Sequence, residues 1–261
     1  MPYESIEQRR QKILDELNVK NKVYVKKLSQ EFGVSMETIR RDLDYLAANN
    51  QLNKIFGGAT KVKNTRLEFL YNERAVYNLE VKKRIAASTA NLVEDNDTIA
   101  LLGGSTTEQI THHLLMKKNL FVITNSLPIS FGLLNYKKEG TFDGRVVLVG
   151  GETHAASMST SGFFAEDMLT KLSVNKAFLS CAGFSPSNIS TFMEEHIQLS
   201  KLLIEKSDLR ILIADSSKMN VHHLYKFATL KDFDMVVCDH EMPDEWINDI
   251  DLDQLQWLAA K

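Results

Sequence analysis

The chain has 261 residues, 44% of them hydrophobic and 25% charged, a composition typical of a globular protein with one large or two medium domains. No apolar run approaches the roughly 18 residues of a membrane span, and the charged first residues contain no apolar signal segment, so we expect a cytoplasmic protein without membrane contact. The formal net charge is −3, but residues 1–63 hold 12 Lys and Arg against 8 Asp and Glu, so an anionic partner is expected for this first part alone.

The first elements predicted along the chain are short helices. Ser5 begins a capping box, and the apolar stripe behind it predicts a helix that ends near Leu17. A second helix is predicted over about 25–32, followed by Gly33 at the position of a C-cap glycine. Ser35 can cap a third helix, because its side chain can accept a hydrogen bond from a free backbone N–H group.

The third helix has an apolar side and a polar, basic side. At about 100° per residue, Ile39, Leu43 and Leu46 share one face. Two short helices joined by a glycine turn, the second with a basic outer face, are typical of a helix-turn-helix, although an ordinary solvated surface is the alternative. Arginine suits such a face because its planar fork binds guanine or phosphate in a bidentate manner. The side chains expected to face DNA are Ser35, Glu37, Thr38, Arg40, Arg41 and Tyr45.

Two features complete the predicted N-terminal module. Asp42 interrupts the basic face, and we expect it to pair with a nearby Lys or Arg within the module. Residues 51–56 predict a β-strand, and Gly57-Gly58 predicts a tight turn after it, which together form a small wing. Lys54 on this strand is expected to lie beside the DNA backbone.

These motifs resemble those of the DeoR family of bacterial transcription regulators. The matching stretches are V-x-V-x-x-L-S-x-x-F-x-V-S at 23–35, T-I-R-R-D-L at 38–43 and F-G-G-A at 56–59. The resemblance implies a winged helix-turn-helix domain over residues 1–60 that binds double-stranded operator DNA. A recognition helix enters the major groove with its N-terminal half, where Arg40 and Arg41 are expected to contact bases or phosphates.

The rest of the chain is predicted to form a second domain of a different class. Residues 61–75 are predicted to be a linker, a helix is predicted over about 76–93, and the domain extends over 76–261. Short apolar runs then alternate with amphipathic stretches, which is typical of an open, doubly wound α/β sheet of the Rossmann-like kind with parallel strands. The predicted strands cover 98–102, 120–124, 145–150, 176–181, 210–215 and 235–239.

Small polar residues follow several of these strands. Open α/β sheets bind ligands at the carboxyl ends of their strands, so these residues are expected to meet around one site. Glycines allow close approach of an anion, hydroxyls add donors, and the start of the helix predicted over 108–115 offers free N–H groups, although an ordinary helix cap is the alternative. The residues expected to bind the ligand are Gly103, Gly104, Ser105, Thr106, Thr107, Thr124, Asn125, Ser126, Gly151, Asp215 and Lys218.

This second part also resembles the sensor domain of the DeoR family. The matching stretches are GSTT at 104–107, TNS at 124–126, GG at 150–151, SGFFAEDML at 161–169, KAFL at 176–179 and ADSSK at 214–218. That domain is similar in fold to ribose-5-phosphate isomerase and typically senses phosphorylated sugars or related metabolites. The resemblance therefore implies a phosphorylated sugar as the effector.

Other candidate chemistry is weaker. The two cysteines, Cys181 and Cys238, lie inside apolar runs, which argues against a disulfide framework. His112-His113 and His222-His223 are adjacent pairs without further ligands at metal-binding spacing, so neither a metal site nor another cofactor is expected.

The segment around the predicted helix 193–206 offers one more candidate. Glu194 and Glu195 fit the first turn of this helix, where acidic residues favour the helix dipole. The polar segment 185–191 before it is a candidate for a mobile lid, which would bring these glutamates toward the ligand.

Three functional hypotheses follow from the sequence. The leading one is a repressor of a sugar-metabolism operon, not an enzyme, that binds DNA as a homodimer or homotetramer and responds to a phosphorylated sugar. The alternative is a sugar-phosphate isomerase with a DNA-binding module, in which Asp215 and Lys218 would be the catalytic pair. The third is a DNA-binding protein whose pocket is vestigial.

Overall fold

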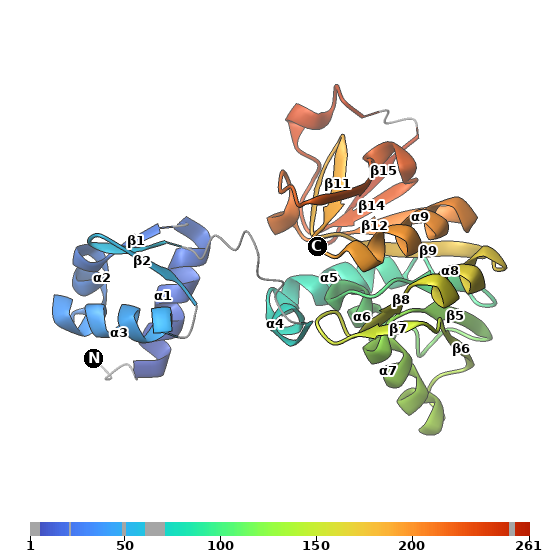
Figure 1. Cartoon of the computed structure of the whole chain (residues 1–261), viewed down its shortest axis with the longest axis horizontal. Helices are drawn as coiled ribbons and strands as arrows, with labels where there is room; N and C mark the ends of the chain where they lie inside the picture. Colours follow the sequence, from blue (N-terminus) through green and yellow to red (C-terminus); the bar gives the residue numbers. More distant parts are fainter. Residues whose placement is uncertain (1–5, 21, 49–50, 61–70, 251–253) are drawn as a thin grey trace. The chain divides into compact units, whose positions relative to one another are not determined.

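A computed structural model describes the chain over residues 6–20, 22–48, 51–60, 71–250 and 254–261. The chain divides into two compact units, residues 1–67 and residues 68–261 (Figure 1). Each unit has its own hydrophobic core.

The described part of the first unit consists of three α-helices and a small antiparallel sheet. Its elements are α1 (Ile6–Lys20), β1 (Lys22–Tyr24), α2 (Val25–Phe32), α3 (Met36–Ala48), β2 (Asn53–Ile55) and β3 (Gly58–Thr60). The strands pair in the order β1, β3, β2, so the hairpin of β2 and β3 is the predicted wing.

Local chemistry explains the turns of the first unit. Gly33 takes the left-handed conformation with φ of 63° between α2 and α3, as a C-cap glycine does. Ser35 caps α3, because its Oγ accepts a hydrogen bond from the Thr38 backbone N–H at 3.1 Å. Gly58 is required in the wing because a Cβ there would lie 2.0 Å from the carbonyl oxygen of Val23.

The second unit is built on a parallel sheet whose strands run in the order β15, β14, β12, β9, β4, β5, β6. Their bounds are β4 (Thr98–Leu101), β5 (Leu120–Thr124), β6 (Gly144–Leu148), β9 (Val174–Ser180), β12 (Ser207–Ile213), β14 (Met235–Cys238) and β15 (Gln256–Ala259). The expected open, doubly wound α/β sheet is confirmed, and each predicted strand overlaps one of these strands.

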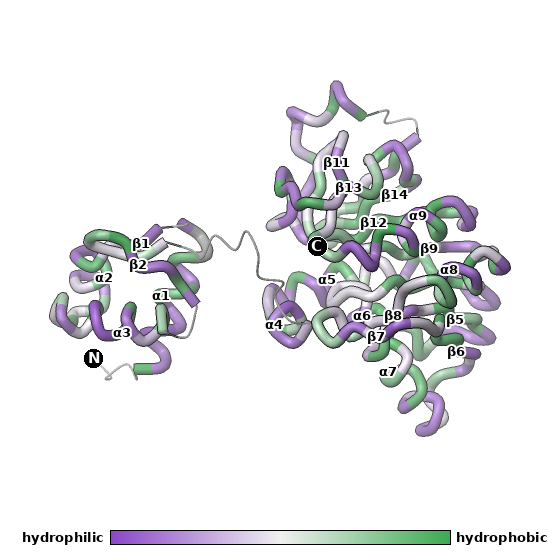
Figure 2. Tube along the Cα trace, viewed as in Figure 1, coloured by the Kyte–Doolittle hydropathy of each residue, from purple (hydrophilic) through white to green (hydrophobic). Residues whose placement is uncertain are grey.

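Helices cover both faces of this sheet (Figure 1). The helices are α5 (Leu79–Ala90), α6 (Ser105–Ile110) and α7 (Leu127–Lys138) on one face, and α8 (Phe163–Thr170) and α9 (Ile197–Lys206) on the other. Ile99 and Leu101 of β4 face the first group, whereas Ala100 faces the second, as the alternation of a strand requires. Figure 2 shows hydrophobic residues gathered along the central strands.

The strand order reverses between β4 and β9, which are neighbours in the sheet. From β4 the chain continues to β5 and β6 toward one edge, and from β9 it continues to β12, β14 and β15 toward the other edge. The carboxyl ends of β4 and β9 therefore form a topological switch point, the place where open α/β sheets bind ligands.

Short strands that the sequence analysis did not predict surround this point. They are β7 (Glu152–His154) with β8 (Ser159–Ser161), and β10 (Gly183–Ser185) with β11 (Asn188–Thr191) and β13 (Tyr225–Ala228). The expectation of a mobile lid over 185–191 is wrong, because Ile189 and Ser190 are fully buried and β11 pairs with strands on both sides.

The start of the second unit also differs from the prediction. The helix predicted over 76–93 corresponds to α5, which begins later, at Leu79. A separate helix, α4 (Tyr71–Val76), precedes it, and Asn78 between them takes a left-handed conformation with φ of 53°. Residues 71–75, assigned to the linker by the sequence, lie within α4, and residues 61–70 lie outside the described residues. The helix predicted over 108–115 begins earlier, at Ser105, and continues as a 3-10 turn to His113.

An aromatic cluster closes the end of the sheet next to β15. The ring centroids of Trp246 and Trp257 lie 6.1 Å apart, and that of Phe184 lies 5.6 Å from Trp246. Phe184 is fully buried, and its carbonyl accepts a hydrogen bond from the Asn220 N–H at 2.8 Å, just beyond Lys218. The cluster therefore supports the loop that follows β12.

Candidate functional site

The outer face of α3 presents exposed charged side chains. The side chains of Arg40 and Arg41 are 58% and 79% exposed, whereas Ile39 and Leu43 on the opposite face are buried. Glu37 lies between the two arginines, with carboxylate oxygens 3.6 Å from Arg40 Nη1 and 3.7 Å from Arg41 Nε. These exposed pairs contribute little to stability, so both guanidinium groups are available to an anionic partner.

Asp42 has the intramolecular role that the sequence predicts. It is 2% exposed, and its two oxygens accept hydrogen bonds from Arg9 Nε at 2.7 Å and Arg10 Nε at 2.9 Å. The guanidinium of Arg10 also lies 3.6 Å from the ring centroid of Tyr45, which is half exposed. Helix α1 is thereby held against α3 by charged side chains that are largely buried.

The wing is attached to α3 by an ion pair. Lys54 of β2 contacts the Asp44 carboxylate of α3, so its ammonium group already has a partner within the unit. The backbone N–H of Val25 donates to the carbonyl of Gly57 at 2.9 Å and holds the wing turn on α2. Phe56 at this turn is fully exposed.

In the second unit, the loop after β4 meets the residues that follow β5. The N–H of Gly103 donates to Asn125 Oδ1 at 2.8 Å, and Asn125 Nδ2 donates to the Thr160 carbonyl at 2.9 Å. Ser126 accepts a hydrogen bond from the N–H of Ile129 and caps α7. Thr124 donates to the Leu101 carbonyl, so its hydroxyl serves the sheet.

The glycine loop continues into the first turn of α6. Gly104 leaves no room for a side chain, because a Cβ there would lie 2.3 Å from Ser180 Oγ at the end of β9. Thr107 Oγ1 donates to the carbonyls of Leu102 and Gly104 at 2.8 Å. Thr106 is 1% exposed, and its Oγ1 has no hydrogen-bond partner among the described residues.

The end of β12 supplies a carboxylate and a cation. Asp215 is 2% exposed and accepts hydrogen bonds from the Ser217 N–H at 3.2 Å and from Asn78 Nδ2 at 3.4 Å. Lys218 Nζ lies 3.7 Å from the same carboxylate. Burial alone would raise the pKa of Asp215, but the charge of Lys218 and the hydrogen bond from Ser217 contribute to a net lowering, so the group is ionised.

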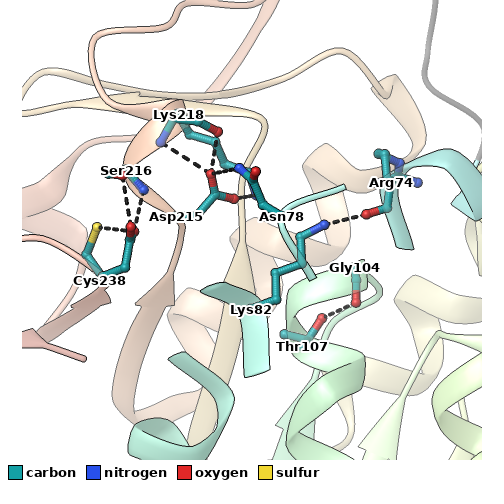
Figure 3. Close-up of polar contacts among 11 residues, drawn as sticks. Arg74, Asn78, Lys82, Gly104, Thr107, Asp215, Ser216, Lys218 and Cys238 are labelled. Atoms are coloured by element: carbon teal, nitrogen blue, oxygen red, sulfur yellow. Dashed lines mark hydrogen bonds and ion pairs between the residues drawn. The ribbon is translucent and has the colours of Figure 1, made fainter. Parts of the chain in front are cut away.

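A buried lysine lies between these two clusters (Figure 3). Lys82 of α5 is 3% exposed, and its Nζ donates to the backbone carbonyl of Arg74 in α4. Burial lowers the pKa of Lys82 to about 8, and the positive charge of Lys218 contributes to the shift. The ammonium group is therefore held in a poorly solvated place close to a second cation.

Tyr71 also holds helix α4 against the second unit, next to α6. The Tyr71 hydroxyl donates to the Glu108 carboxylate of α6, and its backbone N–H donates to the Ala156 carbonyl at 2.9 Å. Burial and the negative charge of Glu108 raise the pKa of Tyr71, which stays protonated. The Arg74 guanidinium lies 5.8 Å from the ring centroid of Phe192.

Gly151 is an expected site residue that no described contact brings to this cluster. With φ of 132° it passes β8 so closely that a Cβ would lie 2.2 Å from the Ser161 carbonyl oxygen. The glycine is therefore explained by strand packing.

The sequence analysis missed Asn78, Lys82 and Ser180. Lys82 carries a recognisable signal, since it occupies the buried stripe of α5 together with Ile85, Ala86 and Thr89 at helical spacing. A lysine in an apolar stripe is rarely fully buried unless its charge has a partner.

The side chains of His112 and His113 are exposed on the second unit. His112 Nδ1 shares a hydrogen bond with the Tyr136 hydroxyl at 2.6 Å, and with His113 it lines an open recess of about 460 Å³ outside α5 and α6. In the part of the chain that the structure describes, no three His, Cys, Asp or Glu side chains gather as metal ligands. None of its described helices has the length and apolar character of a bilayer-crossing segment.

Both units match known protein families. Residues 9–65 match a DeoR-like helix-turn-helix domain, and residues 77–240 match a DeoR C terminal sensor domain. The chain is 37% identical over 235 residues to the uncharacterized HTH-type transcriptional regulator YulB of Bacillus subtilis, covering 90% of this chain and 89% of that protein. It is 30% identical to the lactose phosphotransferase system repressor of Streptococcus mutans, covering 92% and 94%. Among solved structures, ribose 5 phosphate isomerase A of Neisseria gonorrhoeae matches 56% of this chain and 55% of that chain, with 18% identity and a TM-score of 0.39.

Proposed function

This chain belongs to the DeoR family of helix-turn-helix transcriptional regulators, and we propose that it acts in the cytoplasm as a repressor of a sugar-metabolism operon with a phosphorylated sugar as its effector. Relatives that match nearly its whole length are named as transcriptional regulators, so the chain is a DNA-binding regulator and not an isomerase. The name of the lactose phosphotransferase system repressor supports sugar metabolism as the regulated process.

In this proposal, α3 is the recognition helix. Arg40 and Arg41 exchange their loose contacts with Glu37 for contacts with base edges or phosphates, which costs little because all three side chains are exposed. Ser35 and Thr38 stand at the start of the helix, where side chains reach the groove, and Tyr45 and Lys54 flank it.

The DNA-binding part is tested by replacing Arg40 and Arg41 together with alanine. Fluorescence anisotropy with DNA from upstream of the chain's own gene should show lost binding and, where residual binding is measurable, a smaller dependence on salt, because fewer counterions are released. A matched control replaces Lys117 and Lys118 of the second unit with alanine, which removes the same charge. Equal affinity of the arginine variant and the control would contradict the assignment.

Buried Lys82 is the observation on which the effector proposal mainly rests. Its ammonium lies near Lys218 and Arg74, and burial together with the charges of these groups depresses its pKa, so an anion that enters relieves both repulsion and poor solvation. The hydroxyl of buried Thr106, which has no hydrogen-bond partner among the described residues, adds a further donor in the first turn of α6. This donor set suits a phosphate group.

Asp215 supports a sugar as the rest of the ligand. Its carboxylate is ionised, buried and adjacent to Lys218, and carboxylates accept hydrogen bonds from sugar hydroxyls. Control of DNA binding would then follow by linkage. An effector that binds one arrangement of the protein more tightly shifts the chain toward that arrangement and so changes its affinity for DNA. A dimer or tetramer is part of the proposal, since one winged helix makes few base contacts.

The effector is tested by repeating the anisotropy titration with single sugar phosphates, including ribose 5-phosphate, glucose 6-phosphate and fructose 1-phosphate. One of them should shift the DNA affinity of the wild-type chain, and the Lys82→Met variant should lose this shift. The control variant Lys83→Met, whose side chain is half exposed and pairs with Glu80, should retain it. DNA binding that no sugar phosphate affects, without thermal stabilisation by any of them, would identify the pocket as vestigial.

A further inference from the structure

The open recess outside α5 and α6 is separate from the proposed effector site. The two helices pack side by side (Figure 1), and the recess has a volume of about 460 Å³, which is typical of small-molecule sites in proteins. No residue of the proposed effector site lines it. The lining residues are Glu80, Lys83, Arg84 and Ala87 of α5, Gln109 of α6, and His112 and His113 of the 3-10 turn after α6.

Helical spacing brings these side chains to one place. On α5, residues 80, 83, 84 and 87 are three or four positions apart and therefore share one face of the helix. Residues 109, 112 and 113 repeat this spacing along α6 and the turn that follows it. Ala87 contributes only a methyl group to its face, so it leaves open the space that a longer side chain would fill.

Gln109 is the strongest sign that the recess takes a ligand. It is 8% exposed and lines the recess, and its carboxamide makes no hydrogen bond with the described residues. A polar group that is buried without a partner costs free energy, so a ligand that bonds to this amide gains affinity. The amide can both donate and accept a hydrogen bond.

The charges around the recess favour an anion. Arg84 is exposed, and its guanidinium has no ion pair or hydrogen bond with the described residues. Glu80 and Lys83 instead neutralise one another, with 2.8 Å between the carboxylate oxygen and the ammonium nitrogen. His112 shares a hydrogen bond with the Tyr136 hydroxyl through Nδ1, which leaves Nε2 for a ligand. The available groups are therefore mainly donors and one cation.

We propose that this recess is a second small-molecule site, which binds an organic anion through a carboxylate or phosphate group. Arg84 binds the anionic group with its planar fork, and Gln109 hydrogen-bonds a polar group on the body of the ligand. The site is independent of the proposed effector site, because Lys82 belongs to the buried stripe of α5 whereas Arg84 is exposed.

The test is isothermal titration of the full chain with citrate, phosphoenolpyruvate, adenosine monophosphate and inorganic phosphate. At least one of the three organic anions should bind the wild type at millimolar concentration or below, and more tightly than inorganic phosphate does. Comparison of citrate with adenosine monophosphate distinguishes a carboxylate ligand from a phosphate ligand. Arg84→Met should weaken the best organic anion about tenfold to a hundredfold, because a charge-assisted contact is lost.

Three further variants serve as controls. Arg145→Met removes an exposed arginine that lies over the ring of Phe121, on the sheet face covered by α8 and α9, and should bind the anion as the wild type does. Lys82→Met alters the proposed effector site and should also leave this binding unchanged. Gln109→Met removes the amide and should weaken the anion about tenfold. Thermal unfolding checks the fold of this last variant, and exposed Arg84 keeps the test decisive if Gln109→Met is unstable.

Several results would overturn the second site. The wild type would bind none of the three organic anions, or inorganic phosphate would bind as tightly as they do. Equal affinities of Arg84→Met and Arg145→Met would place the anion elsewhere, and loss of binding in Lys82→Met would place it in the proposed effector site. These results are separate from a failure of the proposed repressor function, since the titrations use neither DNA nor a sugar phosphate.

Discussion

Replacing Lys82 with methionine should stabilise the free protein while it removes effector binding. The pKa of Lys82 is lowered from 10.5 to about 8, and at 1.36 kcal/mol per pKa unit the buried ammonium costs about 3 kcal/mol at neutral pH. Methionine avoids this cost but leaves the Arg74 carbonyl without its charged donor, a loss of about 2 kcal/mol. The net gain of about 1 kcal/mol corresponds to a rise in Tm of about 2–4 °C for a unit of this size.

The dependence on pH identifies the cause of this gain. Below pH 8 the lysine is charged in both the folded and the unfolded chain, so the wild-type protein bears the whole cost. Between pH 8 and 10.5 the unfolded chain binds the additional proton, so the stability of the wild type rises with pH. The advantage of Lys82→Met should therefore be largest at neutral pH and become smaller as the pH approaches 10.5.

Scanning calorimetry with and without a sugar phosphate checks both parts of this prediction. A ligand at one hundred times its Kd should stabilise the wild type by about 2.7 kcal/mol and the Lys82→Met variant by far less. Lys83→Met should behave as the wild type does. A lower Tm for Lys82→Met at neutral pH, or a difference that does not change with pH, would refute the reasoning from burial.

Other predictions concern the first unit and His196. Asp42→Ala should destabilise the first unit by about 3–5 kcal/mol, because it leaves buried Arg9 uncompensated; urea unfolding followed by circular dichroism measures this, and a loss below 1 kcal/mol would contradict the burial of the pair. Ser35→Ala should cost about 1 kcal/mol through the lost cap of α3, measured by urea unfolding followed by circular dichroism. Burial, with a contribution from Arg74, lowers the pKa of His196 to about 4, so the unfolded chain binds this proton first and the stability of the second unit should fall by up to about 3 kcal/mol as the pH falls from 6.5 to 4. The His196→Asn variant should lose that part of the acid sensitivity, and an identical pH profile for both proteins would contradict it.

The central strands could be predicted because buried parallel strands are continuous apolar runs. The run L-F-V-I-T predicts a strand over 120–124, and β5 has these bounds. Strand β8 follows another rule: its Ser159, Thr160 and Ser161 are all buried, yet their side chains are polar and satisfied by other polar groups. A strand of hydroxyl residues cannot be distinguished from a loop by periodicity, which is why β8 was not predicted.

The candidate site was predicted in its loops and in the first turn of α6, but not in α5. Gly103 and Asp215 follow strands, and the topology of an open sheet brings such positions together without further information. Lys82 and Asn78 reach the same place only because α5 packs beside it and because Asn78 takes a left-handed conformation, which depends on its hydrogen bond to Asp215 as well as on its own propensity. Long-range contacts of this kind are not contained in local patterns.

The aromatic cluster beside β15 gives the protein a spectroscopic asymmetry. The chain has two tryptophans, Trp246 and Trp257, and both lie in the second unit, in a cluster with Phe184 that supports the loop after β12. Light absorbed near 295 nm is therefore emitted only from this end of the sheet in the second unit. Tryptophan emission can therefore follow ligand binding at the proposed effector site and the unfolding of the second unit.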